Sequence, residues 1–168
     1  MITLVLCCDL NGNIGNDNEL LYHVKGDMKN FRELTEGRTV IMGYNTWESL
    51  PTKPLPNRNN VILTSKDKSI FPKGVSIIRS IDDIKLLAED EDVIVIGGAN
   101  LVNQLIEQDL IDEAYLTIVY RRDVVANKTI NIDKLASILY VQNTIKFFEY
   151  DPFISLLSKW ERFKFRTI

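Results

Sequence analysis

The sequence predicts an α/β domain built around a largely parallel sheet. Short β-branched or apolar runs alternate along the chain with helix-like stretches, and glycines separate many of them. Several runs are apolar at consecutive positions, which is typical of strands covered on both faces. The 168 residues contain no internal repeat and no linker-like segment, so we expect a single domain, 1–168.

Six segments have the composition of strands. They cover residues 2–8, 38–42, 61–65, 75–78, 93–96 and 114–120. The pattern weakens from 123 to 158, and the alternation at 159–167 predicts a closing strand. Together these segments form the predicted sheet.

Four helix-like stretches lie between or beside these strands. The stretch 27–35 carries an apolar stripe, and 46–50 has Asn45 or Thr46 available as an N-cap. A third helix begins at Ser80, where 80–83 is similar to a capping box, and a fourth covers about 100–108. The predicted buried positions are Met28, Phe31, Leu34, Ile81, Ile84, Leu87, Ala88, Leu101, Val102, Leu105 and Ile106. Three prolines predict a rigid, non-helical loop at 50–60.

The charge balance excludes several partners. Twenty basic and twenty-three acidic residues give a net charge of −3, so we expect neither a nucleic acid nor a membrane surface as partner. Cys7 and Cys8 are adjacent and point to opposite faces of a strand, which favours two core residues over a disulfide, a metal site or a nucleophile. The chain shows no membrane-spanning run and no signal peptide, so we expect a cytoplasmic monomer without a bound metal.

Two glycine-containing turns follow apolar strands and precede helices. Gly97 and Gly98 follow the strand at 93–96, and Gly43 follows the strand at 38–42. Residues without side chains let a ligand approach the backbone, and the free N–H groups of a helix start favour an anion such as a pyrophosphate. Single turns of this kind are often purely structural. Two of them at the carboxyl ends of parallel strands favour a nucleotide site, although neither has the GxGxxG pattern of a standard Rossmann domain.

Asp27 is the strongest candidate for a functional carboxylate. It lies at a predicted helix start, and its neighbours Met28 and Phe31 are apolar and would desolvate it. Such a group can bind the amidine-like edge of a ligand, but an ordinary acid at a helix N-terminus has the same local sequence. His23 fits an exposed loop position, and Arg58 can either bind a carboxylate or point into solvent.

A set of short motifs occurs in a fixed order along the chain. They are Ile14-Gly15, Asn18, Asp27, Phe31, Val40-Ile41-Met42-Gly43, Thr46-Trp47-Glu48-Ser49-Leu50-Pro51, Leu55-Pro56-Asn57-Arg58-Asn59, Val61-Ile62-Leu63-Thr64-Ser65, Ile96-Gly97-Gly98-Ala99 and Tyr115-Leu116-Thr117. In order and spacing this set resembles the dihydrofolate reductase family. The similarity is collinear from Met1 to about Val119 and faint beyond, apart from the closing strand around 160–165.

The resemblance implies a fold, a reaction and a cofactor. The fold would be a central, mostly parallel sheet of eight strands flanked by helices, with folate and nicotinamide meeting across its carboxyl edge. The reaction would be reduction of 7,8-dihydrofolate to 5,6,7,8-tetrahydrofolate, in which NADPH delivers hydride to C6 and N5 takes up a proton. Antifolate inhibitors would be further ligands, and the product would serve one-carbon metabolism and thymidylate synthesis.

The resemblance also implies which residues meet the substrate. Asp27 would bind the 2-amino group and N3 of the pterin, with Thr117 supporting its carboxylate. Tyr22 stands where many relatives have a tryptophan near the pterin and is the second candidate catalytic residue. Arg58 would pair with the α-carboxylate of the substrate's glutamate. The other implied substrate contacts are Val5, Met28, Phe31, Leu50 and Ile96.

The implied cofactor site has three parts. The nicotinamide would be covered by Cys7 and the loop formed by Asn13, Ile14, Gly15, Asn16, Asp17, Asn18 and Glu19. The pyrophosphate would be bound at the two glycine turns, by Tyr44, Asn45, Thr46, Gly97, Gly98, Ala99, Asn100, Leu101 and Val102. The adenosine phosphate would be bound by Thr64, Ser65, Lys66 and Arg79.

Departures from the family pattern leave alternatives open. Tyr44, Asn45 and Asn100 occupy positions that are often basic, so NADH remains an alternative to NADPH, with Lys66 and Arg79 able to compensate. The segment 120–131 lacks the acidic pattern that latches the nicotinamide loop in some members. Two other functions also remain: a pyrimidine reductase of the riboflavin-pathway type, and a folate- or nucleotide-binding module without catalysis.

Overall fold

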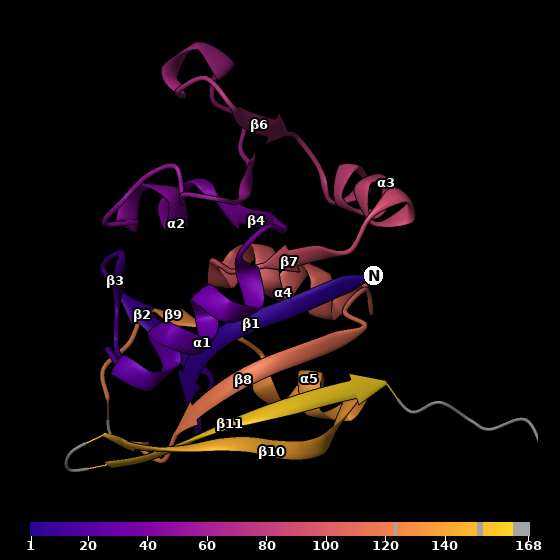
Figure 1. Ribbon diagram of the computed structural model, residues 1–168. Helices are drawn as coiled ribbons and strands as arrows, with labels where there is room; N and C mark the ends of the chain where they lie inside the picture. Colours follow the sequence, from indigo (N-terminus) through magenta and orange to yellow (C-terminus); the bar gives the residue numbers. More distant parts are fainter. Residues whose placement is uncertain (123, 151–152, 163–168) are drawn as a thin grey trace, which may run out of the picture.

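The computed structural model describes residues 1–122, 124–150 and 153–162. Within these residues, eight strands form one sheet in the order β10-β11-β8-β1-β7-β4-β5-β6, and a small sheet, β3-β2-β9, lies beside it (Figure 1). The strands from β8 to β6 pair in parallel, whereas β11 and β10 are added antiparallel at one edge. The predicted mostly parallel, eight-stranded α/β fold is therefore confirmed.

The parallel strands form where the sequence is mostly apolar. They are β1 (Ile2–Asp9), β4 (Thr39–Gly43), β5 (Asn59–Leu63), β6 (Val75–Ile78), β7 (Val93–Val95) and β8 (Glu113–Val119). Val40, Ile41 and Met42 of β4 are all fully buried, because helices cover both faces of the sheet. These bounds agree with the six predicted segments to within two residues at each end.

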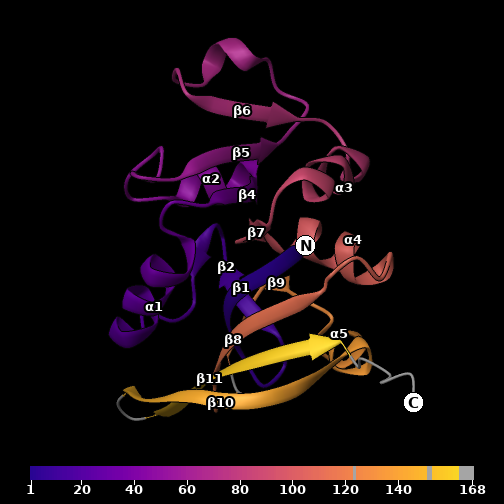
Figure 2. The same cartoon turned by 45° about the vertical axis from the view of Figure 1, so that its right-hand side comes forward.

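The helices form two layers. The layer on one face contains α1 (Lys25–Thr35) and α2 (Tyr44–Ser49), and the layer on the other contains α3 (Ile81–Asp90), α4 (Ala99–Glu107) and α5 (Ile132–Ile138). Figure 2 shows α1 and α4 on opposite sides of β1. A short 3₁₀ helix, Lys68–Ile70, precedes β6. None of the described helices is both long and apolar enough to cross a membrane.

Helix starts agree with the sequence at α3 and differ at α2. Ser80 Oγ accepts a hydrogen bond from Asp83 N at 3.2 Å and Asp83 Oδ2 accepts one from Ser80 N at 2.9 Å, so the predicted capping box is present. The prediction of Asn45 or Thr46 as the cap of α2 was wrong. This helix already begins at Tyr44, and Gly43 occupies the N-cap position without a side-chain bond.

The buried face of α1 also differs from the predicted stripe. Met28 is 48% exposed, and Phe31 and Leu34 are half-buried, whereas the buried residues of this helix are Asn30 and Thr35. The stripe of α4 is as predicted, with its apolar residues in the core. The helix α1 therefore presents a partly polar face to the sheet.

The segments with weak patterns form the small sheet and the sheet edge. They are β2 (Asn13–Asn16), β3 (Glu19–Leu20), β9 (Lys128–Thr129), α5, β10 (Leu139–Tyr150) and β11 (Phe153–Arg162). The segment 13–19, predicted as a loop, is thus largely a hairpin, because β2 pairs with both β3 and β9. The closing strand begins earlier than predicted, and 163–167 lie outside the described residues.

Candidate active site

The carboxyl ends of the parallel strands gather most of the predicted site residues at one edge of the sheet. Because these strands run in the same direction, Cys7 in β1, Thr117 in β8 and the glycine turns after β4 and β7 share this edge. In Figure 1 the edge faces the side where α1, β2 and β3 lie, and the N-terminus marks the opposite edge. We call these two sides the carboxyl edge and the amino edge.

Asp27 and Thr117 are in direct contact at the carboxyl edge. Asp27 lies in the first turn of α1, and the hydroxyl of Thr117 donates a hydrogen bond to its Oδ1. Burial raises the pKa of Asp27 above its ordinary value, and the bond from Thr117 offsets part of this rise. The structure thus places a desolvated carboxyl group here, supported by a neutral donor, and this arrangement suits a group that gains and loses a proton nearer neutral pH than a surface aspartate.

The two cysteines lie on opposite faces of β1, as the sequence indicates. Cys7 is the register partner of Thr117 and lies near Asp27, and burial and the Asp27 charge both raise the pKa of its thiol. Cys8 is fully buried in the core, and burial raises its pKa to about 12. A protonated thiol is a poor nucleophile, so the cysteines serve packing and shape.

An apolar cluster lies between the sheet and α1, the helix that carries Asp27. It contains Val5 and Ile96, and Phe31 and Leu50 pack against the cluster. Met28, predicted for the same wall, is exposed and lies outside this cluster. The cluster also includes residues that the sequence did not single out for the site, Leu34, Trp47, Leu55 and Tyr115. Trp47 is buried and packs edge-on against Phe71, so it contributes to the core of this cluster.

Arg58 is fixed in place and does not extend freely into solvent. Its Nε donates to Thr35 Oγ1 at 2.9 Å, Nη1 donates to the carbonyl of Pro56 at 2.6 Å, and Nη2 lies 3.4 Å from the carbonyl of Arg32. The guanidinium therefore sits at the carboxyl end of α1, where positive charge is favourable. Thr35 was not predicted for the site, and its only sequence signal is its position as the last residue of α1.

The two glycine turns contact each other. Gly43 N donates to the carbonyl of Gly97 at 2.9 Å, and a Cβ added to Gly98 would lie 3.0 Å from Thr46 Oγ1. Gly97 has φ +130°, a conformation that favours glycine. The starts of α2 and α4 thus form one backbone surface. Asn45 and Asn100 are exposed beside it, whereas the side chains of Leu101 and Val102 face the core and do not reach this surface.

The predicted phosphate residues also come together. Arg79 Nη1 donates to the carbonyls of Thr64 and Lys66, both at 2.6 Å, and so joins the ends of β5 and β6. Lys66 Nζ lies 4.6 Å from the ring centre of Tyr44 at the start of α2. Ser65 is exposed between them. Two positive charges therefore lie together after β5 and β6, and that of Lys66 reaches the start of α2.

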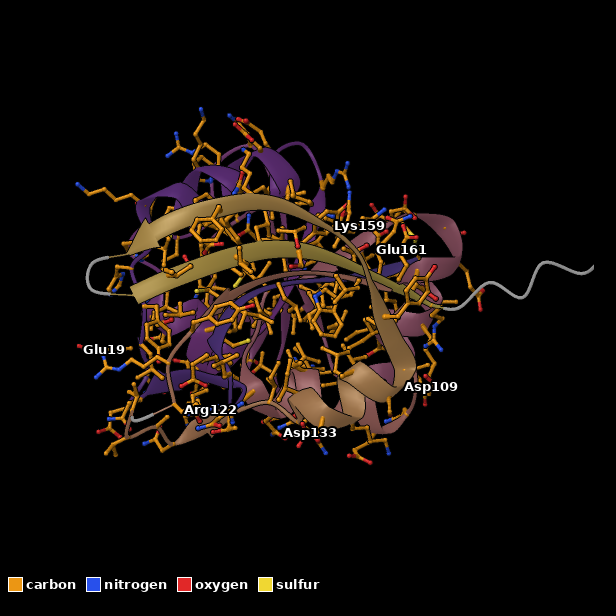
Figure 3. All side chains as sticks on the ribbon, turned by 90° about the horizontal axis from the view of Figure 1, so that it is seen from below. Glu19, Asp109, Arg122, Asp133, Lys159 and Glu161 are labelled. Atoms are coloured by element: carbon orange, nitrogen blue, oxygen red, sulfur yellow. The ribbon has the colours of Figure 1, made fainter. Side chains whose placement is uncertain are left out.

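The neutral side chains of Asn127 and Thr129 hold the segment 13–19 in place. Asn127 Nδ2 donates to Asp17 Oδ1 at 2.7 Å, and Asp17 N donates to Asn127 Oδ1 at 3.1 Å. Thr129 Oγ1 donates to Asn13 Oδ1 at 2.7 Å. Asp17 and Asn18 form the turn with positive φ, and Figure 3 shows Glu19 pointing outward at the end of the hairpin. Asn127 and Thr129 thus contact this segment through amide and hydroxyl groups rather than carboxylates.

A family model for dihydrofolate reductase matches residues 1–137. The chain belongs to the dihydrofolate reductase family. A dihydrofolate reductase of Staphylococcus aureus (strain Mu50) is 40% identical over 118 residues, which are 70% of this chain and 70% of that protein. A dihydrofolate reductase of Bacillus subtilis (strain 168) is 37% identical over 118 residues, 70% of this chain and 68% of that protein.

Among solved structures, a dihydrofolate reductase of Enterococcus faecalis, complexed with NADP(H) and RAB-propyl, has the same fold. Its TM-score is 0.81 at 24% sequence identity, and the superposition covers 98% of this chain and 97% of that one. The shared fold includes the C-terminal strands, which lie beyond the matched part of the family model.

The hydroxyl of Tyr22, the second candidate catalytic residue, contacts Asp9. In this dihydrofolate reductase family member Tyr22 is buried, and its hydroxyl donates to Asp9 Oδ2 at 3.1 Å. Burial and this bond raise the pKa of Tyr22. Asp9 was not predicted for the site. The only signal was an aspartate at the end of a strand, followed by the turn-forming Asn11 and Gly12.

Proposed function

We propose that this chain reduces 7,8-dihydrofolate to 5,6,7,8-tetrahydrofolate with NADPH. The observation that carries the proposal is the pair formed by Asp27 and Thr117 at the carboxyl edge, in a chain of the dihydrofolate reductase family. A half-buried carboxyl group with a raised pKa can accept hydrogen bonds from the 2-amino group and N3 of a pterin. It thereby orients the ring and favours proton uptake at N5.

Arg58 and the apolar cluster fit the rest of the substrate. The guanidinium of Arg58 is held at the carboxyl end of α1 by Thr35 and Pro56, so little freedom is lost when it pairs with the α-carboxylate of the glutamate. Val5, Ile96, Phe31 and Leu50 line an apolar surface that suits the pterin and benzoyl rings and excludes water from the reacting atoms.

The cofactor residues fit a dinucleotide that carries an extra phosphate. The contact between the two glycine turns leaves a backbone surface without side chains, which suits a pyrophosphate. Lys66 and Arg79 place positive charge beside Tyr44 and Thr64, which suits a 2′-phosphate and favours NADPH over NADH. When bound, NADPH supplies the hydride that the substrate accepts at C6.

The test is NADPH oxidation by the purified chain, with and without dihydrofolate, alongside the variant Asp27→Asn. We expect turnover that requires dihydrofolate, that the variant largely loses and that a bound antifolate inhibits. A folded protein that binds NADPH and an antifolate without turnover would overturn the proposal. NADPH oxidation that requires the pyrimidine substrate of the riboflavin pathway, and not dihydrofolate, would overturn the proposal as well.

We also propose that residues 1–168 form one domain that acts as a monomer in the cytoplasm. In support, β11 near the end of the described chain pairs with β8, which itself pairs with β1, so early and late segments share one sheet. Two free thiols suit a reducing compartment. Light scattering after size exclusion should give the mass of a single chain, and the mass of a dimer would contradict the monomer.

A further inference from the structure

The carboxylate of Asp9 accepts hydrogen bonds from both ends of the segment that contains β2 and β3, at Asn13 and at Tyr22. Asp9 is fully buried at the end of β1. Its Oδ1 accepts hydrogen bonds from Asn11 N at 2.9 Å and Asn13 N at 3.0 Å. Its Oδ2 accepts hydrogen bonds from Asn13 Nδ2 at 2.9 Å and the Tyr22 hydroxyl at 3.1 Å. One side chain therefore joins the start of the hairpin, at Asn13, to its far end, at Tyr22.

The two oxygens of this carboxylate accept hydrogen bonds from different kinds of donor. Oδ1 binds backbone N–H groups and shapes the turn after β1, whereas Oδ2 binds two side chains that flank the hairpin. Hydrogen bonds to an ionised acceptor are about twice as strong as those between neutral groups. Because the site is buried, water cannot easily replace a lost partner.

The contacts continue on both sides of Asp9. Asn13 Oδ1 accepts the bond from Thr129 in β9, so the start of the hairpin is held from two directions. Tyr22 packs in a small cluster with Val24 and Val119, and Cys7 packs against this cluster. Cys7 is in turn the register partner of Thr117, which holds Asp27. Asp9 thus connects the hairpin to the edge on which the proposed chemistry occurs.

We infer that Asp9 is a positioning residue for the cofactor half of the site, which acts through Asn13 and Tyr22 to hold residues 13–22 in the arrangement that binds NADPH. The inference rests on the proposed function, because the role of this segment in cofactor binding belongs to that proposal. Tyr22 is accordingly a link in this network, and its hydroxyl is committed to Asp9.

The first test measures the hairpin without any ligand. Asp9→Asn keeps Oδ1 and its two backbone bonds, but places an NH₂ group where Oδ2 accepts from Asn13 and Tyr22. The matched control is Asp112→Asn, because Asp112 Oδ2 accepts from Ile2 N at 2.7 Å at the opposite end of the same strand. Hydrogen exchange of residues 10–22 should become faster in Asp9→Asn and stay unchanged in Asp112→Asn. Unchanged exchange in both variants would overturn the inference.

The second test measures binding. If Asp9→Asn leaves about one molecule in ten with the hairpin in its binding arrangement, the apparent Kd for NADPH rises about tenfold. The Kd for dihydrofolate should change by less than about twofold, because neither Asp27 nor Arg58 is hydrogen-bonded to Asp9, Asn13 or Tyr22. Equal losses for both ligands would overturn the inference. A wild-type chain that binds neither ligand would instead contradict the proposed function, while the exchange experiment would still test Asp9.

A milder variant keeps the inference testable if Asp9→Asn fails to fold. Tyr22→Phe removes only the hydroxyl and one of the four bonds, so we expect about a threefold rise in the apparent Kd for NADPH. In the double variant the two effects should be less than additive, since both act on the same oxygen. Full additivity, or no effect of Tyr22→Phe on either exchange or the Kd, would contradict a role of Asp9 through Tyr22.

Discussion

The carboxylates at the two edges of the parallel sheet have different partners. At the amino edge opposite charges are paired: the amino group of Met1 lies 3.3 Å from Asp92, Arg162 lies 2.8 Å from Asp109, and Lys159 pairs with Glu161. Figure 3 shows Lys159, Glu161 and Asp109 gathered at this end, away from Glu19. At the carboxyl edge, by contrast, Asp27 and Asp9 accept hydrogen bonds from hydroxyl and amide groups.

This difference separates stability from chemistry along the same strands. Ion pairs on a partly exposed edge each add little to the free energy of unfolding. Burial raises the pKa of Asp27, so ionisation of this carboxyl group destabilises the fold, and its protonation becomes sensitive to the ligand. Substitutions at the carboxyl edge should therefore change activity most, and substitutions at the amino edge should change stability alone.

Asp27→Asn should give the largest effect. We expect kcat/KM for dihydrofolate to fall by about 10²- to 10⁴-fold, because the carboxylate that orients the pterin and promotes protonation is lost. The Kd for NADPH should change little. Steady-state kinetics and a binding titration measure the two quantities, and equal loss of both would mean that Asp27 is only structural.

The same variant should be more stable than the wild type at neutral pH. Since burial raises the pKa of Asp27 in the folded state, ionisation penalises folding as the pH rises from the unfolded pKa to the folded one, and the penalty persists above both. Denaturant unfolding should therefore give a higher free energy of unfolding for Asp27→Asn at pH 7. Near pH 3, where the carboxyl group is protonated in both states, the difference should largely vanish. A less stable variant at neutral pH would contradict this account.

Gly97→Ala should weaken the cofactor site next most strongly. The residue has φ +130°, and an added Cβ would lie 3.2 Å from Thr46 Oγ1 between the two helix starts. We expect a loss of about 1–3 kcal/mol in the free energy of unfolding and about a tenfold rise in the Kd for NADPH. The matched control is Gly74→Ala, which has φ +87° but no atoms near the added Cβ. It should lower stability and leave the Kd unchanged.

Arg58→Lys should raise the KM for dihydrofolate by about tenfold with a smaller change in kcat. A lysine keeps the charge but cannot donate to Thr35 and Pro56 while also pairing with a carboxylate as a planar fork. Steady-state kinetics test this, with the exposed Arg32→Lys on the same helix as control. If both variants behave alike, the substrate does not use the fixed guanidinium.

Arg162→Ala at the amino edge should have the smallest effect. It removes the bonds to Asp109 and the longer ion pair with Asp112, and lowers the free energy of unfolding by about 0–1 kcal/mol, because these pairs are partly exposed. Its kcat/KM should stay within about twofold of the wild type. A large loss of activity would show that the two edges are not independent.

Burial also explains which strands could be predicted from the sequence. The six parallel strands are recognisable because both faces of the sheet are covered and most of their residues are apolar, and Asp27, Thr117 and the glycine turns follow from their ends. The strand β10 was missed because residues 140–147 are all exposed, so no alternation marks an inner face. Both α5 and β9 are short. The strand β9 is formed by pairing with β2, and α5 is held by the burial of Leu135 in the core, so neither has a strong local pattern.

Side-chain networks between distant segments were the least predictable part. Arg58 looks like a loop residue until Thr35 from α1 binds it, and Asp9 looks like a turn residue until Tyr22 returns to it after the hairpin. Met28 was assigned by helical spacing, but α1 turns Asn30 inward and leaves Met28 exposed. Such contacts depend on how elements pack, and no local pattern encodes them. The assigned ligand contacts of the site residues themselves stay predictions until the variants are measured.

The pH dependence of dihydrofolate-dependent NADPH oxidation, from about pH 5 to about pH 9, tests the central claim most directly. In the wild type the rate should be nearly constant at low pH and fall as the pH rises through the raised pKa of Asp27. In Asp27→Asn the proton comes from solvent, so the slower rate should fall about tenfold per pH unit across the whole range. No turnover by the folded wild type, or two parallel profiles, would contradict the assignment of Asp27 as the group that controls proton uptake.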